Sequence, residues 1–248
     1  MMFVKYLKLF HAFLLAFWIL WIKFPHLNKE QKLFEIQNWS RATLNVLGVR
    51  LENVSEITQA FRSERPILLV ANHVSWVDAL IIQAIRPSIF VAKAEVKNWP
   101  VVGAIAAACG VIFVKRATAS SARQMVDDVA QALYNGYCVA GFPEGTSSEG
   151  SDVQMFHANI FEAAIHQDIE VQTLTLRYTH PTTGALCTKA AFIGELGFLE
   201  SLHQVMSAKG IVAKVYVGEI LSPQGHSRRS LAQLSQRTIS TQLALLSA

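Results

Sequence analysis

The chain has 248 residues, a length that suits one large domain or a domain with a short appendage. Hydrophobic residues make up 52% of it and charged residues only 16%, an apolar excess that excludes a protein whose whole surface faces water. The formal net charge is +4, which suits nucleic acid or the anionic face of a membrane. The sequence has no dense Lys/Arg cluster, and this favours the membrane.

The N-terminal residues 3–24 read FVKYLKLFHAFLLAFWILWIKF, an apolar stretch with basic residues near both ends. Its uncharged part, 9–22, is short for a hydrocarbon core of about 30 Å, but the whole segment spans it if the lysines reach toward the headgroups. A signal peptide is the rival interpretation, yet no small-residue cleavage site follows. We therefore predict a membrane segment over residues 1–26, spanning or lying in one leaflet, and one domain over residues 27–248.

Residues 28–47 have helical spacing, which predicts either a second, interfacial helix or an amphipathic helix packed on the domain. Beyond them, short apolar runs alternate with helical patterns. This alternation predicts an α/β fold, with a single central, mostly parallel or mixed sheet flanked by helices and preceded by the N-terminal segment. The predicted strands are 67–71, 89–92, 111–115, 137–142, 171–177, 190–193 and 213–217. The predicted helices are 120–135, 158–165, 198–208 and 230–246.

The first candidate site is the segment NHVSWVD, residues 72–78, which joins the run 67–71 to a helical run, 79–85. On a regular helix His73 and Asp78 would lie about 140° apart, whereas a strand-to-helix turn can bring them together. A carboxylate on one imidazole nitrogen leaves the other nitrogen as a general base. The same spacing also arises by chance, with Asp78 as a helix N-terminal charge and His73 as a turn residue.

Two later strand ends carry further candidates. The run GVIFVKR, residues 110–116, ends in Lys115 and Arg116, which point to opposite faces if the strand continues. One cation can then reach a site, and a basic strand end without a function is the alternative. The run FPEGT, residues 142–146, follows another apolar strand, and its Pro and Gly predict a tight turn that presents Glu144.

In this order, NHVSWVD, GVIFVKR and FPEGT resemble the motifs of the glycerolipid acyltransferases typified by lysophosphatidic acid acyltransferase. The resemblance covers roughly residues 45–220. It implies acyl transfer from acyl-CoA or acyl-carrier protein to a lysolipid hydroxyl, with His73 as general base and Asp78 orienting it. It implies no metal and no cofactor besides the thioester co-substrate. By the same resemblance, the acceptor is bound by Lys115, Arg116, Glu144, Gly145 and Thr146.

The chain departs from the family pattern at Ser147, where the family usually has Arg. The resemblance predicts acylation of the sn-2 hydroxyl of 1-acyl-sn-glycerol-3-phosphate, giving phosphatidic acid in phospholipid biosynthesis, at the cytoplasmic face of the inner membrane. The missing guanidinium leaves the same chemistry on another lysolipid, such as lyso-ornithine lipid, as an alternative. A non-catalytic lipid-binding protein on the same fold is the second alternative. A metal-dependent hydrolase would need a third ligand, which the spacing does not supply.

Overall fold

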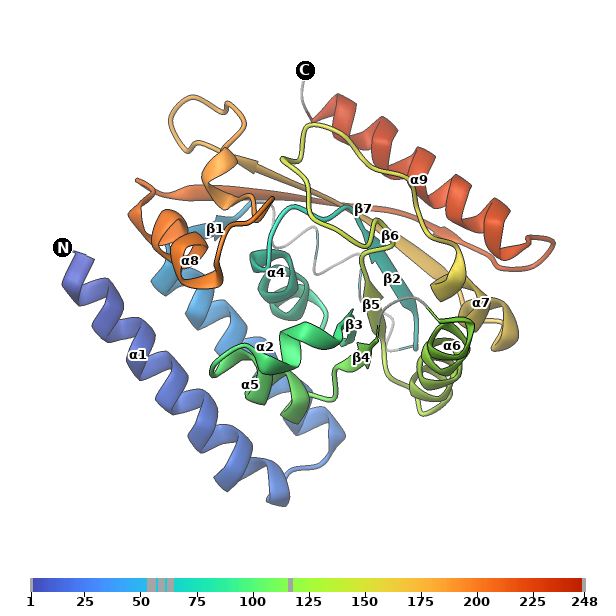
Figure 1. Ribbon diagram of the computed structural model, residues 1–248, viewed down its shortest axis with the longest axis horizontal. Helices are drawn as coiled ribbons and strands as arrows, with labels where there is room; N and C mark the ends of the chain where they lie inside the picture. The colour runs from blue at the N-terminus through green and yellow to red at the C-terminus, as the bar shows by residue number, and fades with distance from the viewer. Residues whose placement is uncertain (1, 53–56, 58–60, 62–64, 116–117, 247–248) are drawn as a thin grey trace.

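A seven-stranded sheet forms the centre of the protein, in the order β1-β7-β6-β2-β5-β3-β4 (Figure 1). The structure is a computed structural model that describes all residues except 1, 53–56, 58–60, 62–64, 116–117 and 247–248. Neighbouring strands pair in parallel except β6 and β7, which are antiparallel, so the predicted mostly parallel or mixed sheet is confirmed. The strands are β1 Val49–Leu51, β2 Leu68–Ala71, β3 Ile89–Lys93, β4 Ile112–Val114, β5 Val139–Gly141, β6 Val171–Thr179 and β7 Ile211–Leu221.

Helices surround this sheet, and three of them begin at capping boxes. Asn28, Thr118 and Ser227 each accept a backbone N–H of the first turn of α2, α6 and α9. The α-helices are α1 Met2–Trp18, α2 Lys29–Leu47, α4 Val77–Ile85, α5 Val102–Ala108, α6 Ala119–Tyr134, α7 Asn159–His166, α8 Phe198–Ser207 and α9 Arg228–Leu245. The shorter turns are η1 Ile19–Lys23, η2 Phe24–His26, η3 Ala94–Asn98 and η4 Thr188–Ala190.

Both faces of the sheet are covered, as β2 shows. Leu69 and Ala71 belong to a core formed with α1, α2, α4 and α8. Leu68 and Val70 belong to a second core, formed with α6, α7 and α9 on the other face (Figure 1). Successive side chains of a strand point to opposite faces, so the two cores alternate along β2. All four residues are 0% exposed, which explains why this strand is continuously apolar.

The helical stretch Met2–His26 is long and apolar enough to cross a membrane, yet it lies along the domain. Its N-terminal end is held to the region of α8. Lys5 Nζ donates to the carbonyl oxygen of Met206 at 2.7 Å, and the Tyr6 hydroxyl lies 2.6 Å from His203 Nδ1.

The rest of this stretch is held to α2. Trp39 Nε1 donates to the carbonyl oxygen of Ala12 at 2.8 Å, and Lys23 forms an ion pair with Glu35 at the C-terminal end. α2 in turn packs on α4, and its buried face includes Leu44 and Leu47. Of the two alternatives for residues 28–47, the contacts therefore agree with an amphipathic helix packed on the domain.

The predicted strands and helices are found within a few residues of their expected ends, with one exception. The predicted strand at 190–193 is wrong: η4 ends at Ala190 and irregular chain follows. The backbone of this segment bonds to a loop instead of a strand, because Phe192 N–H donates to the carbonyl oxygen of Val74 at 2.9 Å. The helix α5 and the short strand β1 were not predicted. β1 extends the sheet by pairing with β7.

Candidate active site

The polar residues singled out in the sequence lie at the carboxyl ends of neighbouring parallel strands. β2 leads into Asn72 and His73, and β5 leads into the turn 142–146. β3 ends at Lys93, and β4 ends just before Lys115. These four strands are neighbours in one parallel set, so their carboxyl ends share an edge of the sheet. Open α/β sheets bind ligands at this edge.

The turn between β2 and α4 brings His73 and Asp78 together. His73 Nδ1 lies 2.8 Å from Asp78 Oδ2, and the same oxygen accepts the backbone N–H groups of Val74 at 2.7 Å and Ser75 at 2.9 Å. Asp78 is 0% exposed and lies in the first turn of α4, where the helix dipole favours a negative charge. Asp78 therefore combines the two roles that its sequence spacing left as alternatives.

The ring of His73 is held by the turn that follows β5. Phe142 stacks on it with ring centroids 4.1 Å apart and an interplanar angle of 10°. Because Nδ1 faces Asp78, Nε2 is the nitrogen left for a substrate, and His73 is among the residues that line the cavity of this site. The pair thus has the geometry of a general base with an orienting carboxylate.

Glu144 holds the main chain of the same turn. One carboxylate oxygen accepts His73 N–H at 2.6 Å, and the other accepts Gln154 N–H at 2.9 Å. Glu144 is 4% exposed, and burial raises its pKa although both N–H groups oppose this shift. The family resemblance implied that Glu144 binds the substrate. In the structure its two oxygens are engaged by backbone, and it is not among the cavity-lining residues.

Two further contacts fix the loop that carries His73. The Asn72 side chain donates to the carbonyl oxygen of Leu176 at 2.9 Å and accepts Leu176 N–H at 2.8 Å, so it mimics a strand pair with β6. Ser148 N–H donates to the carbonyl oxygen of His73 at 2.9 Å. His73 is therefore held at its side chain, its backbone N–H and its carbonyl group, by α4 and by the loop that follows β5.

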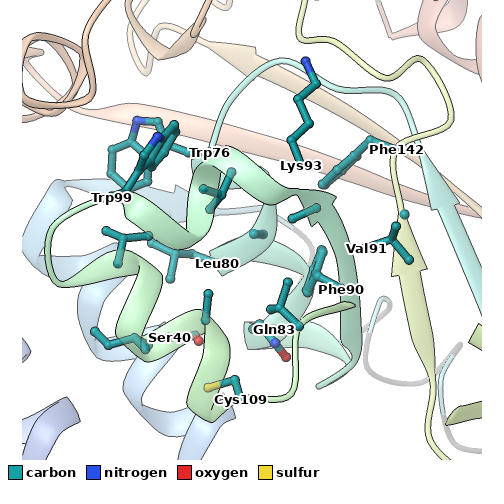
Figure 2. Close-up of a pocket in the computed structure, with 18 of the residues that line it drawn as sticks. Ser40, Trp76, Leu80, Gln83, Phe90, Val91, Lys93, Trp99, Cys109 and Phe142 are labelled. Carbon is teal, nitrogen blue, oxygen red and sulfur yellow. The ribbon is translucent and has the colours of Figure 1, made fainter. Parts of the chain in front are cut away.

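A cavity of about 790 Å³ opens at His73 and extends between the helices on that side of the sheet. Figure 2 shows its two ends: Lys93 and Phe142 lie at one, and Ser40 and Cys109 lie at the other. Its walls are mainly apolar and include residues of α1, α2, α4 and α5. Burial raises the pKa of the Cys109 thiol to about 12, so this cysteine stays protonated and is a poor nucleophile.

The turn 142–146 contributes to the polar end of the cavity. Gly145 and Thr146 line it, and the backbone of Gly145 has φ of 67°, as the tight turn requires. Lys93 and Lys115 are the lysines among the cavity-lining residues. Arg116 lies outside the described residues, so its predicted role stays a prediction.

Ser147, which stands where a guanidinium was expected, also lines the cavity. Its hydroxyl donates to the carbonyl oxygen of Phe192. The described residues contain no cluster of three His, Cys, Asp or Glu side chains arranged to hold a metal.

Several contacts of the site were not predicted from the sequence, among them those of Phe142, Gln154 and Tyr178. Phe142 was considered only as part of a turn. Gln154 donates its backbone N–H to Glu144, and a backbone contact of this kind leaves no sign in the residue type. Tyr178, near the end of β6, donates its hydroxyl to Asp78 Oδ1 at 2.5 Å. A polar aromatic residue at the end of a buried strand was the available signal, but nothing in the spacing linked it to Asp78.

A family model described as Acyltransferase matches residues 49–177, more than half of the chain. The chain belongs to the acyltransferase family. The matched range contains His73, Asp78 and the turn 142–146, so the family assignment and the geometry describe the same site.

The relatives of this acyltransferase are named for two different acceptor lipids. It is 31% identical to a lyso-ornithine lipid O-acyltransferase of Pseudomonas aeruginosa over 71% of this chain and 67% of that protein. It is 31% identical to the enzyme of the same name from Rhizobium meliloti over 78% and 68%. It is 33% identical to a 1-acyl-sn-glycerol-3-phosphate acyltransferase of Neisseria gonorrhoeae over 60% and 58%.

The fold of the acyltransferase also has a counterpart among solved structures. The crystal structure of the 1-acyl-sn-glycerophosphate (LPA) acyltransferase PlsC from Thermotoga maritima superposes with a TM-score of 0.64. The superposition covers 100% of this chain and 98% of that one, at 19% identity. This likeness shows the fold.

Glu144→Gln tests whether this carboxylate holds the His73 turn. The amide of Gln must place its NH₂ group against one of the two backbone N–H groups, which destabilises the protein by about 1–3 kcal/mol. We expect a lower melting temperature and a lower kcat, with KM little changed because Glu144 is not among the cavity-lining residues. Glu149→Gln, an exposed change in the same loop, is the control. A raised KM with unchanged kcat would instead favour substrate binding by Glu144.

Proposed function

We propose that the acyltransferase transfers an acyl chain from a thioester donor to a hydroxyl group of a lysolipid. The observation that carries this proposal is the His73–Asp78 pair at the polar end of an apolar cavity. His73 Nε2 takes the proton of the acceptor hydroxyl as its oxygen attacks the thioester carbonyl. The tetrahedral intermediate then collapses and expels the thiolate. The thiolate takes the proton from the imidazolium, which returns His73 to its neutral form. Acyl-CoA and acyl-carrier protein are the donors that fit this scheme.

The apolar part of the cavity supports an acyl chain as its occupant. Its lining includes Leu9, Phe13 and Ala16 of α1 and Leu80 of α4, and an alkyl chain in such a space gains by leaving water. Lys93 and Lys115 lie among the lining residues at the polar strand ends. In this arrangement the acyl chain lies among the helices, and the headgroup of the lipid remains near Lys93 and Lys115.

Lyso-ornithine lipid is the acceptor we propose first. Ser147 supports this choice, because a hydroxyl engaged by the Phe192 carbonyl oxygen offers no cation for a phosphomonoester. The names of the relatives from Pseudomonas aeruginosa and Rhizobium meliloti agree with it. Acylation of 1-acyl-sn-glycerol-3-phosphate at sn-2 is the second candidate. It is favoured by Lys93 and Lys115, which suit phosphate, and by the relative from Neisseria gonorrhoeae.

We also propose that the acyltransferase lies on the cytoplasmic face of the inner membrane without crossing it. Met2–His26 is held to the domain at its beginning, middle and end, and a spanning orientation would break these contacts. Its outward face carries exposed apolar side chains suited to one leaflet, namely Phe3, Leu7, Phe10, Leu14, Trp18 and Trp21. Both thioester donors are cytoplasmic molecules, which supports a site on that face.

An acceptor panel with purified protein tests the function. Lyso-ornithine lipid and 1-acyl-sn-glycerol-3-phosphate are each supplied with acyl-CoA or acyl-carrier protein, and product is measured by mass spectrometry. We expect transfer to lyso-ornithine lipid and a loss of about 10²- to 10⁴-fold in His73→Ala, since general-base catalysis commonly contributes that much. Transfer to neither acceptor, or unchanged activity in His73→Ala, would contradict the proposal and favour a lipid-binding protein.

Ser147→Arg tests the basis of acceptor choice. The added guanidinium gives a phosphate two parallel hydrogen bonds. We therefore expect the kcat/KM for 1-acyl-sn-glycerol-3-phosphate to rise about tenfold relative to that for lyso-ornithine lipid. Ser147→Ala, which only removes the hydrogen bond to Phe192, should leave the ratio unchanged. An equal effect of both variants on the ratio of the two kcat/KM values would show that residue 147 does not distinguish the two headgroups.

Epitope tags at the two termini test the membrane arrangement. A helix lying in one leaflet leaves both tags on the cytoplasmic side. We therefore expect protease to remove both tags from inverted membrane vesicles and neither from intact spheroplasts. Removal of the N-terminal tag alone from spheroplasts would show that the helix crosses the bilayer.

A further inference from the structure

Tyr178 contacts the His73–Asp78 pair from outside the cavity. Its side chain is 1% exposed, and its hydroxyl donates to Asp78 Oδ1 at 2.5 Å. His73, Val74 and Ser75 all contact the other oxygen, Oδ2. Within the described part of the chain, Tyr178 is thus the one donor to Oδ1. It is not among the cavity-lining residues, so it acts on the reaction through Asp78.

We propose that Tyr178 is a positioning residue whose hydroxyl holds Asp78 Oδ1 and sets the proton affinity of the His73–Asp78 pair. This inference rests on the proposed role of His73 as general base. It adds a third side chain to the pair, contributed by β6 rather than by the turn that carries the other two.

The physical argument concerns a buried carboxylate. A hydrogen bond to the charged form of Asp78 stabilises that form. If the bond is lost, Asp78 attracts a proton more strongly, and it also attracts the imidazolium of His73 more strongly. The pair then binds its proton more tightly, whichever of the two residues carries it. A base that is already protonated cannot accept the proton of the acceptor hydroxyl. As the pH is lowered, a protein without the Tyr178 hydroxyl therefore loses its activity at a higher pH than the unaltered protein.

The surroundings of Tyr178 favour donation by its hydroxyl. Burial raises the pKa of the phenol, and the charge of Asp78 raises it further, so Tyr178 keeps its proton. Among the residues that the structure describes, Glu144 and Cys187 are further titratable residues in contact with this cluster. Glu144 interacts with both His73 and Asp78, and Cys187 contributes the backbone N–H that bonds to the carbonyl oxygen of Tyr178 at 2.9 Å. Replacing the phenol by a phenyl ring leaves both groups in place.

Tyr178→Phe is the direct test, read as the pH dependence of kcat/KM. We expect the acid limb to move to higher pH by about one unit, a typical effect of a hydrogen bond to a charged group. KM at high pH should change little, because Tyr178 is not among the cavity-lining residues. Tyr216→Phe makes the same change at an exposed position of the adjacent strand β7 and should leave the profile unchanged.

A loss of activity at all pH values without movement of the acid limb would overturn the inference, since it would assign Tyr178 to packing alone. Movement of the limb to lower pH would overturn it as well, because it would mean that the pair had come apart.

A second variant has the opposite expected sign. Incorporation of 3-fluorotyrosine at position 178 makes the phenol more acidic and hence a stronger donor to Asp78 Oδ1. The acid limb should then move to lower pH, while the fold is retained because the side chain keeps its shape. This variant decides the matter if Tyr178→Phe fails to fold, and an unmoved limb in the fluorinated protein would count against the inference.

His73→Ala separates this inference from the proposed function. If His73→Ala is inactive and neither Tyr178 variant moves the acid limb, only the role of Tyr178 fails. If His73→Ala keeps the activity of the unaltered protein, the general-base role fails, and the inference about Tyr178 fails with it.

Discussion

The buried carboxylate of Asp78 is the constraint around which the site is built. A carboxylate removed from water is costly unless donors surround it, and here they come from the turn after β2 and from β6. Glu144 repeats the arrangement on the other side of His73, with two backbone donors. One buried carboxylate thus holds the imidazole of His73, and the other holds its N–H. In a site screened from water, hydrogen bonds of this kind are stronger than they would be at the surface.

The sequence predicted those parts of the site that are encoded locally. His73 and Asp78 are five residues apart, and the turn that joins them could be inferred from a strand followed by a helix. The sheet was predictable because β2 is apolar throughout, as a strand buried on both faces must be. Residues 190–193 look like a strand for the same compositional reason. They brace the loop at Val74 instead, and composition carries no information about which backbone group a segment will pair with.

Contacts across the sheet could not be read from the sequence. Tyr178 and Asp78 are 100 residues apart, and they meet because β6 lies beside β2, which only the strand order reveals. Glu144 was recognised as a site residue, but the direction of its side chain depends on where the N–H groups of His73 and Gln154 lie. The apolar N-terminus was assigned to the membrane. Its packing against α2 and α8, and its share in the cavity wall, depend on the folded domain.

The long-range hydrogen bonds of the site have a consequence for the order in which the protein matures. Leu9, on the cavity side of α1, is made long before β6, whose Leu176 and Tyr178 close on Asn72 and Asp78. Contacts between residues about a hundred positions apart form late, because a long loop must be closed before they are gained. In the proposed membrane arrangement, the nascent chain therefore presents its apolar helix to the bilayer while the site around His73 is still incomplete. Attachment then precedes activity, and the last contacts of the site form at the membrane surface.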